Sequence, residues 1–124
     1  MSDLSAFSLE GKQIAVTGAN TGIGQGIAVA VARAGGDVVG IGRSSMDETA
    51  RLVEAHGAHF TPITCNIADI DASVAMLEAL LSQAPLHGLV NNAGIIRRAD
   101  AVDFTEEDWD AVMNVNLKSA FFLC

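Results

Sequence analysis

Three glycines near the start of the chain are the residues whose spacing first points to chemistry. They lie in the run Thr17-Gly18-Ala19-Asn20-Thr21-Gly22-Ile23-Gly24. Glycine permits a sharp turn and lets backbone N–H groups approach a phosphate closely. Where such a run joins a strand to a helix, those N–H groups and the helix dipole favour a bound pyrophosphate. The spacing G-x-x-x-G-x-G differs from the general dinucleotide pattern G-x-G-x-x-G, so an ordinary glycine turn is the alternative.

The elements that would hold this run in place follow from the apolar pattern along the chain. Short apolar runs bounded by turn residues predict buried strands, and apolar residues three or four positions apart predict helices. Two pairs, Ser45 with Glu48 and Thr105 with Asp108, have the spacing of helix-capping residues. The predicted strands are residues 13–17, 38–41, 60–67 and 89–91, and the predicted helices are 24–33, 45–55, 71–83 and 105–124.

Strands and helices alternate through the whole chain, and this order indicates an α/β fold. Apolar strands connected by helices form parallel sheets covered on both faces, with right-handed crossovers. We therefore predict a doubly wound parallel sheet, a Rossmann fold, with the strand order 3-2-1-4. The glycine run should lie at the carboxyl ends of the strands, beside the switch point where such sheets bind their ligands.

Composition and charge exclude several other classes of protein. Half of the 124 residues are apolar, which indicates one domain with a packed core. A formal net charge of -8 argues against nucleic acid and anionic membranes as partners. The N-terminus, Met1 to Leu4, does not resemble a signal peptide, and no apolar run has membrane-spanning length.

The cysteines and histidines show no metal-binding pattern. Cys65 and Cys124 are far apart in the sequence and match no metal or redox spacing, which favours a reducing cytosol and a cytoplasmic protein. The three histidines also lack metal-ligand spacing, and we expect them to be surface or structural residues. They are His56, His59 and His87.

Three motifs in order make the chain resemble the classical short-chain dehydrogenase/reductase family. The glycine run resembles the cofactor motif of that family, and Asn91-Asn92-Ala93-Gly94 resembles its second motif. Asn114-Val115-Asn116-Leu117, on the last predicted helix, resembles the third motif of the family. Because each motif falls on the expected element, the resemblance extends over nearly the whole chain. It implies an oxidoreductase that binds NAD or NADP.

The resemblance also assigns a role in cofactor binding to several residues. Asn66 and Ile67 would hold the adenine, since an amide oxygen can accept a hydrogen bond from its exocyclic amine. From residue type alone, these two residues read equally well as a strand end with a polar cap. The phosphates and the adenosine ribose would be bound by Gly18, Asn20, Thr21, Gly22, Ile23 and Gly24, and the cofactor ribose would lie against Asn92, Ala93 and Gly94.

Asn116 can be interpreted both with and without the family. It shares one helix face with Trp109, Met113 and Ala120, which is otherwise apolar. A buried amide on such a face needs hydrogen-bond partners, so a core asparagine bonded to backbone is one interpretation. In the family, this asparagine supports a water that connects the catalytic lysine to solvent, and the resemblance gives Asn116 this catalytic role.

The chain lacks other residues that the family uses for catalysis. The family's catalytic serine and its Tyr-x-x-x-Lys motif are absent, and the chain contains no tyrosine. We therefore expect residues 1–124 to be a dinucleotide-binding domain that is incomplete at its C-terminus. Such a fragment should not transfer hydride, because the tyrosine that donates the proton is missing. A regulator of the same fold that binds the cofactor without catalysis is an alternative.

The end of the second predicted strand bears on the choice between NAD and NADP. An acidic residue there would bind the ribose 2′-hydroxyl of NAD. This chain instead has Gly42, Arg43 and Ser44 at that point, and Asp37 is at the other end of the strand. Arg43 would suit a 2′-phosphate, whereas a surface arginine in a loop is the alternative. The resemblance to the sugar-acid dehydrogenases, described in the next paragraph, favours NAD, so both cofactors stay open.

The run Ile95-Ile96-Arg97-Arg98-Ala99-Asp100-Ala101 suggests a class of substrate. It resembles the 2-deoxy-D-gluconate 3-dehydrogenases, also named 2-dehydro-3-deoxy-D-gluconate 5-dehydrogenases, which act on sugar acids. One of the two arginines could bind a substrate carboxylate, whereas a solvated pair or a salt bridge between subunits is the alternative. A 3-oxoacyl-carrier-protein reductase is the second candidate. The resemblance further implies a homotetramer for the full-length protein.

Overall fold

Four parallel strands form one sheet in the computed structural model, which describes residues 3–124. Met1 and Ser2, the first residues of the stretch compared with signal peptides, lie outside the described residues. The strands are β1 (Gln13–Thr17), β2 (Asp37–Gly42), β3 (Phe60–Thr64) and β4 (Gly88–Val90). Their order is β3-β2-β1-β4 and every pairing is parallel, as predicted.

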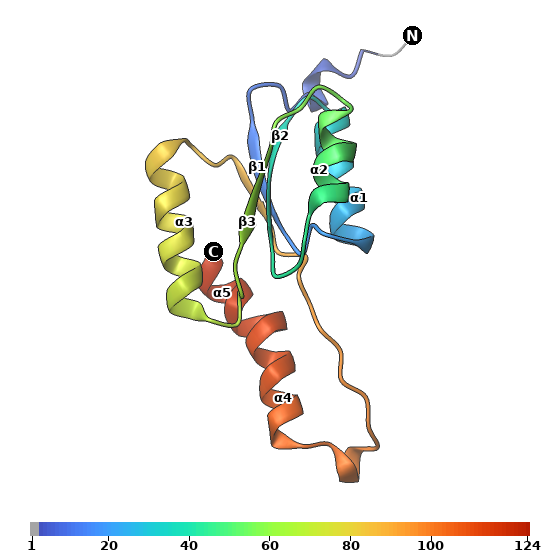
Figure 1. Cartoon of the computed structure of the whole chain (residues 1–124), viewed down its shortest axis with the longest axis vertical. Helices are drawn as coiled ribbons and strands as arrows, with labels where there is room; N and C mark the ends of the chain where they lie inside the picture. Colours follow the sequence, from blue (N-terminus) through green and yellow to red (C-terminus); the bar gives the residue numbers. More distant parts are fainter. Residues whose placement is uncertain (1–2) are drawn as a thin grey trace.

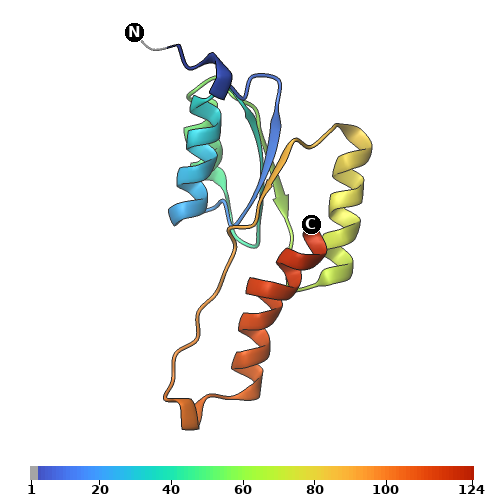
Figure 2. The ribbon, with the colours of Figure 1, turned by 180° about the vertical axis from the view of Figure 1, so that it is seen from behind.

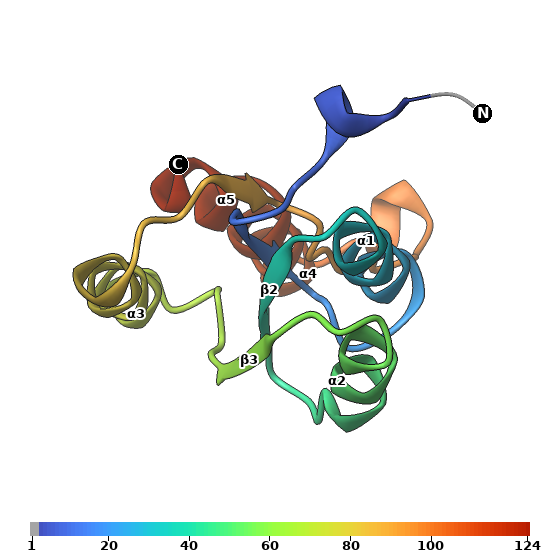
Figure 3. The same ribbon diagram turned by 90° about the horizontal axis from the view of Figure 1, so that it is seen from above.

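Helices cover both faces of this sheet (Figures 1 and 3). On one face lie α1 (Gly22–Arg33) and α2 (Asp47–Glu54), which contact each other and the strands beneath them. On the other face lie α3 (Ile70–Gln83) and α5 (Ser119–Leu123), which also contact each other. This arrangement confirms the predicted α/β fold with a doubly wound parallel sheet.

The central strands are buried on both faces because successive side chains of a strand point to opposite sides. Ile14 and Val16 of β1 pack in the apolar cluster beneath α1 and α2. Ala15, between them, packs in the second cluster with Leu80 of α3 and Leu123 of α5. This explains why the strands read as unbroken apolar runs, as is typical of a parallel sheet covered on both sides.

Several predicted element boundaries differ from those in the structure by one to three residues, and the two described next concern the glycine run and the third strand. The first helix begins at Gly22 rather than at residue 24, so the last two glycines of the run lie in its first turn. The third strand ends at Thr64 rather than at Ile67. Its neighbour β2 ends at Gly42, which pairs with Thr64, and the chain beyond has no partner strand to continue the ladder.

The capping pattern predicted for the second helix is wrong, whereas that for the last helix is confirmed. Thr105 accepts a hydrogen bond from the backbone N–H of Asp108 at 3.1 Å. Helix α2 begins at Asp47, after Met46, so the Ser45 hydroxyl accepts a hydrogen bond from the N–H of Asp47 at 3.3 Å and does not cap the helix. The carboxylate of Glu48 pairs with Arg51 at 2.7 Å. The Arg51 guanidinium, by hydrogen bonding and by its charge, lowers the pKa of Glu48 below its ordinary value.

The last predicted helix is divided by a π-helical turn at Asn114–Lys118. Before this turn lies α4 (Glu106–Met113), and after it lies α5. Figure 2 shows that the chain between β4 and α4 runs far from the sheet before α4 returns towards it. Short 3-10 turns occur at Ser5–Phe7 and Ala101–Asp103.

The expected buried face of this last helix is absent from the structure. Trp109 is 52% exposed, and Asn116 is also exposed. Trp109 belongs to α4, which extends beyond the end of the sheet (Figure 1), whereas Asn116 contacts the loop after β4 at Ile95. The amide of Asn116 is therefore not a buried core group in this chain.

In residues 3–124, no helix is long and apolar enough to span a membrane. In the same range, no group of three or more histidine, cysteine, aspartate or glutamate side chains is placed to hold a metal ion.

Candidate functional site

A cleft opens at the carboxyl ends of the four strands, around the central strand β1. Its volume is about 350 Å³, within the usual range for small-molecule sites. Loops that follow β1, β2, β3 and β4 all contribute to its walls. The cleft is lined by Gly18, Asn20, Thr21, Ile41, Gly42, Arg43, Ser44, Cys65, Asn66, Ile67, Asn92, Ala93, Gly94, Ile95, Arg97 and Val115.

Most of the cofactor-binding residues predicted from the sequence line this one cleft. Those that do are Gly18, Asn20, Thr21, Arg43, Asn66, Ile67, Asn92, Ala93 and Gly94. Gly22, Ile23 and Gly24 lie next to it in the first turn of α1, and Asn116 lies behind its wall. Sequence reasoning missed Ile41, Cys65, Ile95 and Val115 as cleft residues. The position of Cys65, directly before Asn66, is a signal that could have found it, whereas the three apolar residues carry no local signal.

A single hydroxyl group joins the end of β1 to the loop after β4. The side chain of Thr17 is 1% exposed, and its oxygen accepts hydrogen bonds from the backbone N–H groups of Asn92 and Ala93 at 3.1 and 2.9 Å. In return, the Asn92 amide donates to the carbonyls of Thr17 and Gly18 at 3.1 and 3.3 Å. The first and second motifs are thus held together at the switch point of the sheet.

Two glycines make this close approach possible. Gly18 has a φ of +67°, in the left-handed region that favours glycine. At Gly24, an added Cβ would lie 2.0 Å from the carbonyl oxygen of Gly18 and 2.5 Å from the amide nitrogen of Asn92. Helix α1 therefore packs directly against the turn, and no larger residue fits at position 24.

In the turn between β1 and α1, two carbonyl groups accept hydrogen bonds from side chains, whereas no side chain caps the first N–H groups of α1. Thr49 donates to the carbonyl of Ala19 at 2.7 Å, and Gln25 donates to that of Asn20 at 3.3 Å. Thr21, the residue before the helix, makes no side-chain cap. The first N–H groups of a helix have no partner within it, so those of α1 are available to an anion beside the cleft. These features fit a pyrophosphate group.

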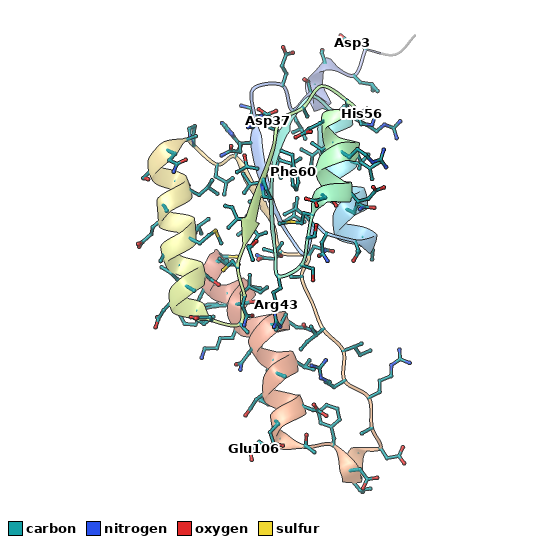
Figure 4. All side chains as sticks on the ribbon, viewed as in Figure 1. Asp3, Asp37, Arg43, His56, Phe60 and Glu106 are labelled. Atoms are coloured by element: carbon teal, nitrogen blue, oxygen red, sulfur yellow. The ribbon has the colours of Figure 1, made fainter. Side chains whose placement is uncertain are left out.

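The two charged residues at the ends of β2 lie far apart. Asp37, at the start of the strand, accepts a hydrogen bond from the backbone N–H of His59 at 2.8 Å. Arg43 follows the other end and lines the cleft. Figure 4 labels Asp37 and Arg43 at these opposite ends of the sheet. Within residues 3–124 Arg43 forms no ion pair, so its charge is available to a ligand. The cleft thus has a cation, and no acidic residue, at the end of β2.

The side chains of Asn66 and Asn116 both bond to backbone groups. The Asn66 oxygen accepts from the backbone N–H of Ala68 at 3.1 Å, which closes a turn after β3. The Asn116 oxygen accepts from the N–H of Ile95 at 2.8 Å, and its amide donates to the carbonyl of the same residue at 3.0 Å. Asn116 thus holds both backbone groups of one residue in the cleft wall.

Comparison with known proteins places this arrangement among dehydrogenases. The sequence model of the short chain dehydrogenase family matches residues 12–124. The 2-dehydro-3-deoxy-D-gluconate 5-dehydrogenase of Escherichia coli is 50% identical over 121 residues, which are 97% of this chain and 48% of that protein. The chain spans about half the length of the curated relatives it matches.

Solved structures share the fold and contain bound cofactors. A structure from Agrobacterium tumefaciens, assigned as a 2-deoxy-D-gluconate 3-dehydrogenase with bound NADP, is 49% identical with a TM-score of 0.86. The similarity covers 94% of this chain and 46% of that one. The 3-oxoacyl-[acyl-carrier protein] reductase of Brucella melitensis, in complex with NAD, is 30% identical with a TM-score of 0.83, over 90% and 46% of the two chains.

Proposed function

The chain belongs to the short-chain dehydrogenase family, and from this we propose that the whole protein is an oxidoreductase that transfers hydride between a nicotinamide cofactor and a sugar acid. One observation carries the proposal: Thr17 and Asn92 join the glycine turn to the loop after β4 at the edge of the cleft. A bound nicotinamide cofactor would supply or accept the hydride. The residues of this chain would bind and orient it.

We assign the cofactor-binding roles by position around the cleft. The N–H groups at the start of α1, from Gly22, Ile23 and Gly24, would bind the phosphates together with the turn that begins at Gly18. Support comes from the uncapped helix start and from the open space beside Gly22. Asn66 and Ile67 would flank the adenine, and Asn92, Ala93 and Gly94 the ribose nearer the reaction. We propose that residues 1–124 form this dinucleotide-binding domain.

Arg43 supports NADP as the preferred cofactor. It lines the cleft at the end of β2, where a 2′-phosphate would lie in a sheet of this order. A guanidinium can bind a phosphate by two parallel hydrogen bonds. The related structures contain NADP in one case and NAD in another, so both cofactors stay within the proposal.

The sugar-acid substrate is supported by several relatives of high identity to this chain. The Escherichia coli protein and others named as 2-dehydro-3-deoxy-D-gluconate 5-dehydrogenases are 42–50% identical to it. By comparison, the 3-oxoacyl-[acyl-carrier-protein] reductase of Thermotoga maritima is 38% identical. We therefore place a sugar acid before an acyl thioester.

The remaining parts of the proposal concern catalysis and assembly. Residues 1–124 alone would not transfer hydride, because they contain no tyrosine to donate the proton. In the whole protein, Asn116 would support the water behind a catalytic lysine. We propose a cytoplasmic homotetramer. The free thiols of Cys65 and Cys124 support a reducing compartment.

Steady-state kinetics on the complete protein test this function. It is incubated with NADP⁺ or NAD⁺ and either 2-deoxy-D-gluconate or D-gluconate, and reduced nicotinamide is followed by absorbance. Oxidation of a sugar acid is the expected result. Turnover only in the reverse direction with NADPH and a 3-oxoacyl thioester would assign the reductase activity instead. Cofactor binding without turnover of either substrate class would indicate a non-catalytic regulator.

A further inference from the structure

The segment that follows the second motif alternates its side chains between the cleft and solvent. Residues 91–100 have no helix or strand, but their chain is drawn out (Figure 2). Ile95 and Arg97 line the cleft, whereas Ile96 is 65% exposed and Arg98 does not line it. Alternation of this kind follows from extended backbone, in which neighbouring side chains point to opposite sides.

Asn116 fixes which side chains of this segment face the cleft. Its side chain bonds both the N–H and the carbonyl of Ile95, at 2.8 and 3.0 Å, much as a neighbouring strand would. With Ile95 held in the cleft wall, the residue two positions later is directed to the same side. Asn116 therefore acts as a positioning residue for Arg97.

The guanidinium of Arg97 is restrained on one side and retains unused donors on the other. Its Nε lies 3.5 Å from a carboxylate oxygen of Asp108, in the first turn of α4, and its Nη1 donates to the carbonyl of Ile96 at 3.2 Å. Within residues 3–124 no partner bonds the Nη2 group. The side chain is 45% exposed, so a ligand in the cleft has access to it.

The cleft therefore contains two arginines, one on each side of the central strand. Arg43 follows β2 and Arg97 follows β4, and these strands flank β1 on opposite sides. Adjacent strands of a sheet are about 4.8 Å apart, so the ends of β2 and β4 are separated by roughly 10 Å. One anionic group near β2 and another in the loop after β4 can thus be bound at the same time by different cations.

We propose that Arg97 binds the carboxylate of the substrate and selects sugar acids over neutral sugars, and that Arg98 has no part in this selection. The assignment rests on the proposed function and adds the residue that recognises the acid. Arg97 offers the charge and the free N–H groups that suit a carboxylate, and Asp108 restrains its guanidinium. Arg98 is the matched control because it is the same residue type one position away, outside the cleft.

Calorimetric titration of the complete protein saturated with NADPH tests the assignment, because the reduced cofactor cannot oxidise either probe during the measurement. The probes are D-gluconate and D-gluconamide, a neutral analogue of nearly the same shape. We expect wild type and Arg98→Ala to bind gluconate more tightly than the amide. Arg97→Ala should weaken gluconate binding at least tenfold and leave the affinities for the amide and for NADP unchanged. Arg97→Lys should restore part of the loss, since it keeps the charge but not the paired donors.

Several outcomes would overturn the assignment. A loss of gluconate affinity in Arg98→Ala equal to that in Arg97→Ala would assign the effect to general charge. Equal losses for gluconate, amide and NADP in Arg97→Ala would indicate a structural or cofactor-binding role. A wild-type protein that binds acyl thioesters and no sugar acid would refute the proposed substrate class before any variant is made, and this assignment with it.

Discussion

Replacement of Thr17 by valine tests whether one buried hydroxyl group joins the two halves of the cleft. Valine has nearly the same shape as threonine, but it cannot accept the hydrogen bonds from Asn92 and Ala93. The N–H of Asn92 keeps a second acceptor, the carbonyl of Val90 at 3.0 Å. The N–H of Ala93 loses the acceptor that it has in the structure. The variant therefore leaves one donor unsatisfied.

The size of the effect follows from this count. A buried donor without a partner costs about 1–3 kcal/mol, and the Ala93 N–H is only part-buried at the cleft, so the free energy of unfolding should fall by about 1 kcal/mol. Such a loss is roughly a fivefold change in the ratio of folded to unfolded protein. Thr17→Ser is the matched control, because it keeps the hydroxyl and loses only a methyl group, at about 1 kcal/mol. Chemical denaturation measures both losses.

Since these two losses are similar in size, a local measurement must separate them. Native-state hydrogen exchange should show a less protected Ala93 amide in Thr17→Val and an unchanged one in Thr17→Ser. Cofactor affinity should fall in the valine variant alone, because the loop after β4 is loosened. Equal protection of the Ala93 amide in wild type and Thr17→Val would refute the proposed connection.

Three further variants test the glycine turn, the cofactor preference and the cleft wall. Gly24→Ala should destabilise the protein by about 1–3 kcal/mol and weaken dinucleotide binding, because its Cβ would meet the carbonyl of Gly18. Gly26→Ala is the control and should be neutral or stabilising, since no heavy atom lies within 4 Å of its Cβ. Thermal unfolding and cofactor titration compare the two variants, and equal effects would contradict the packing argument. Arg43→Ala should weaken NADP binding about tenfold or more and leave NAD almost unchanged; equal losses for the two cofactors, or none, would make Arg43 a surface residue and favour NAD. Asn116→Leu in the complete protein should lower kcat strongly and leave cofactor affinity near wild type. The loss of thermal stability should be small, since Ile95 is only partly buried and water can reach its freed backbone groups. Undiminished kcat on a sugar acid would refute the proposed support of a water behind the catalytic lysine.

Local chemistry explains why the fold could be predicted so closely. The apolar runs at 13–17 and 38–41, and the cap at Thr105, depend on side chains a few positions apart. Their alternation determines the crossovers and hence the sheet order. Predictions failed where a helix began at another residue, as α2 does at Asp47, or where a strand ended because its neighbour ended.

The sequence by itself determined the elements, their parallel order and the group of residues at the strand ends, because these depend on local periodicity and on glycine and capping chemistry. Only the tertiary structure decided which polar atoms meet across the fold. Thr17 and Ala93 are 76 positions apart, and Asn116 reaches Ile95 from a π-helical turn that no pattern indicated. Only the structure separated Arg97 from Arg98, because the side of an extended segment that faces a cleft depends on a contact made from elsewhere in the chain.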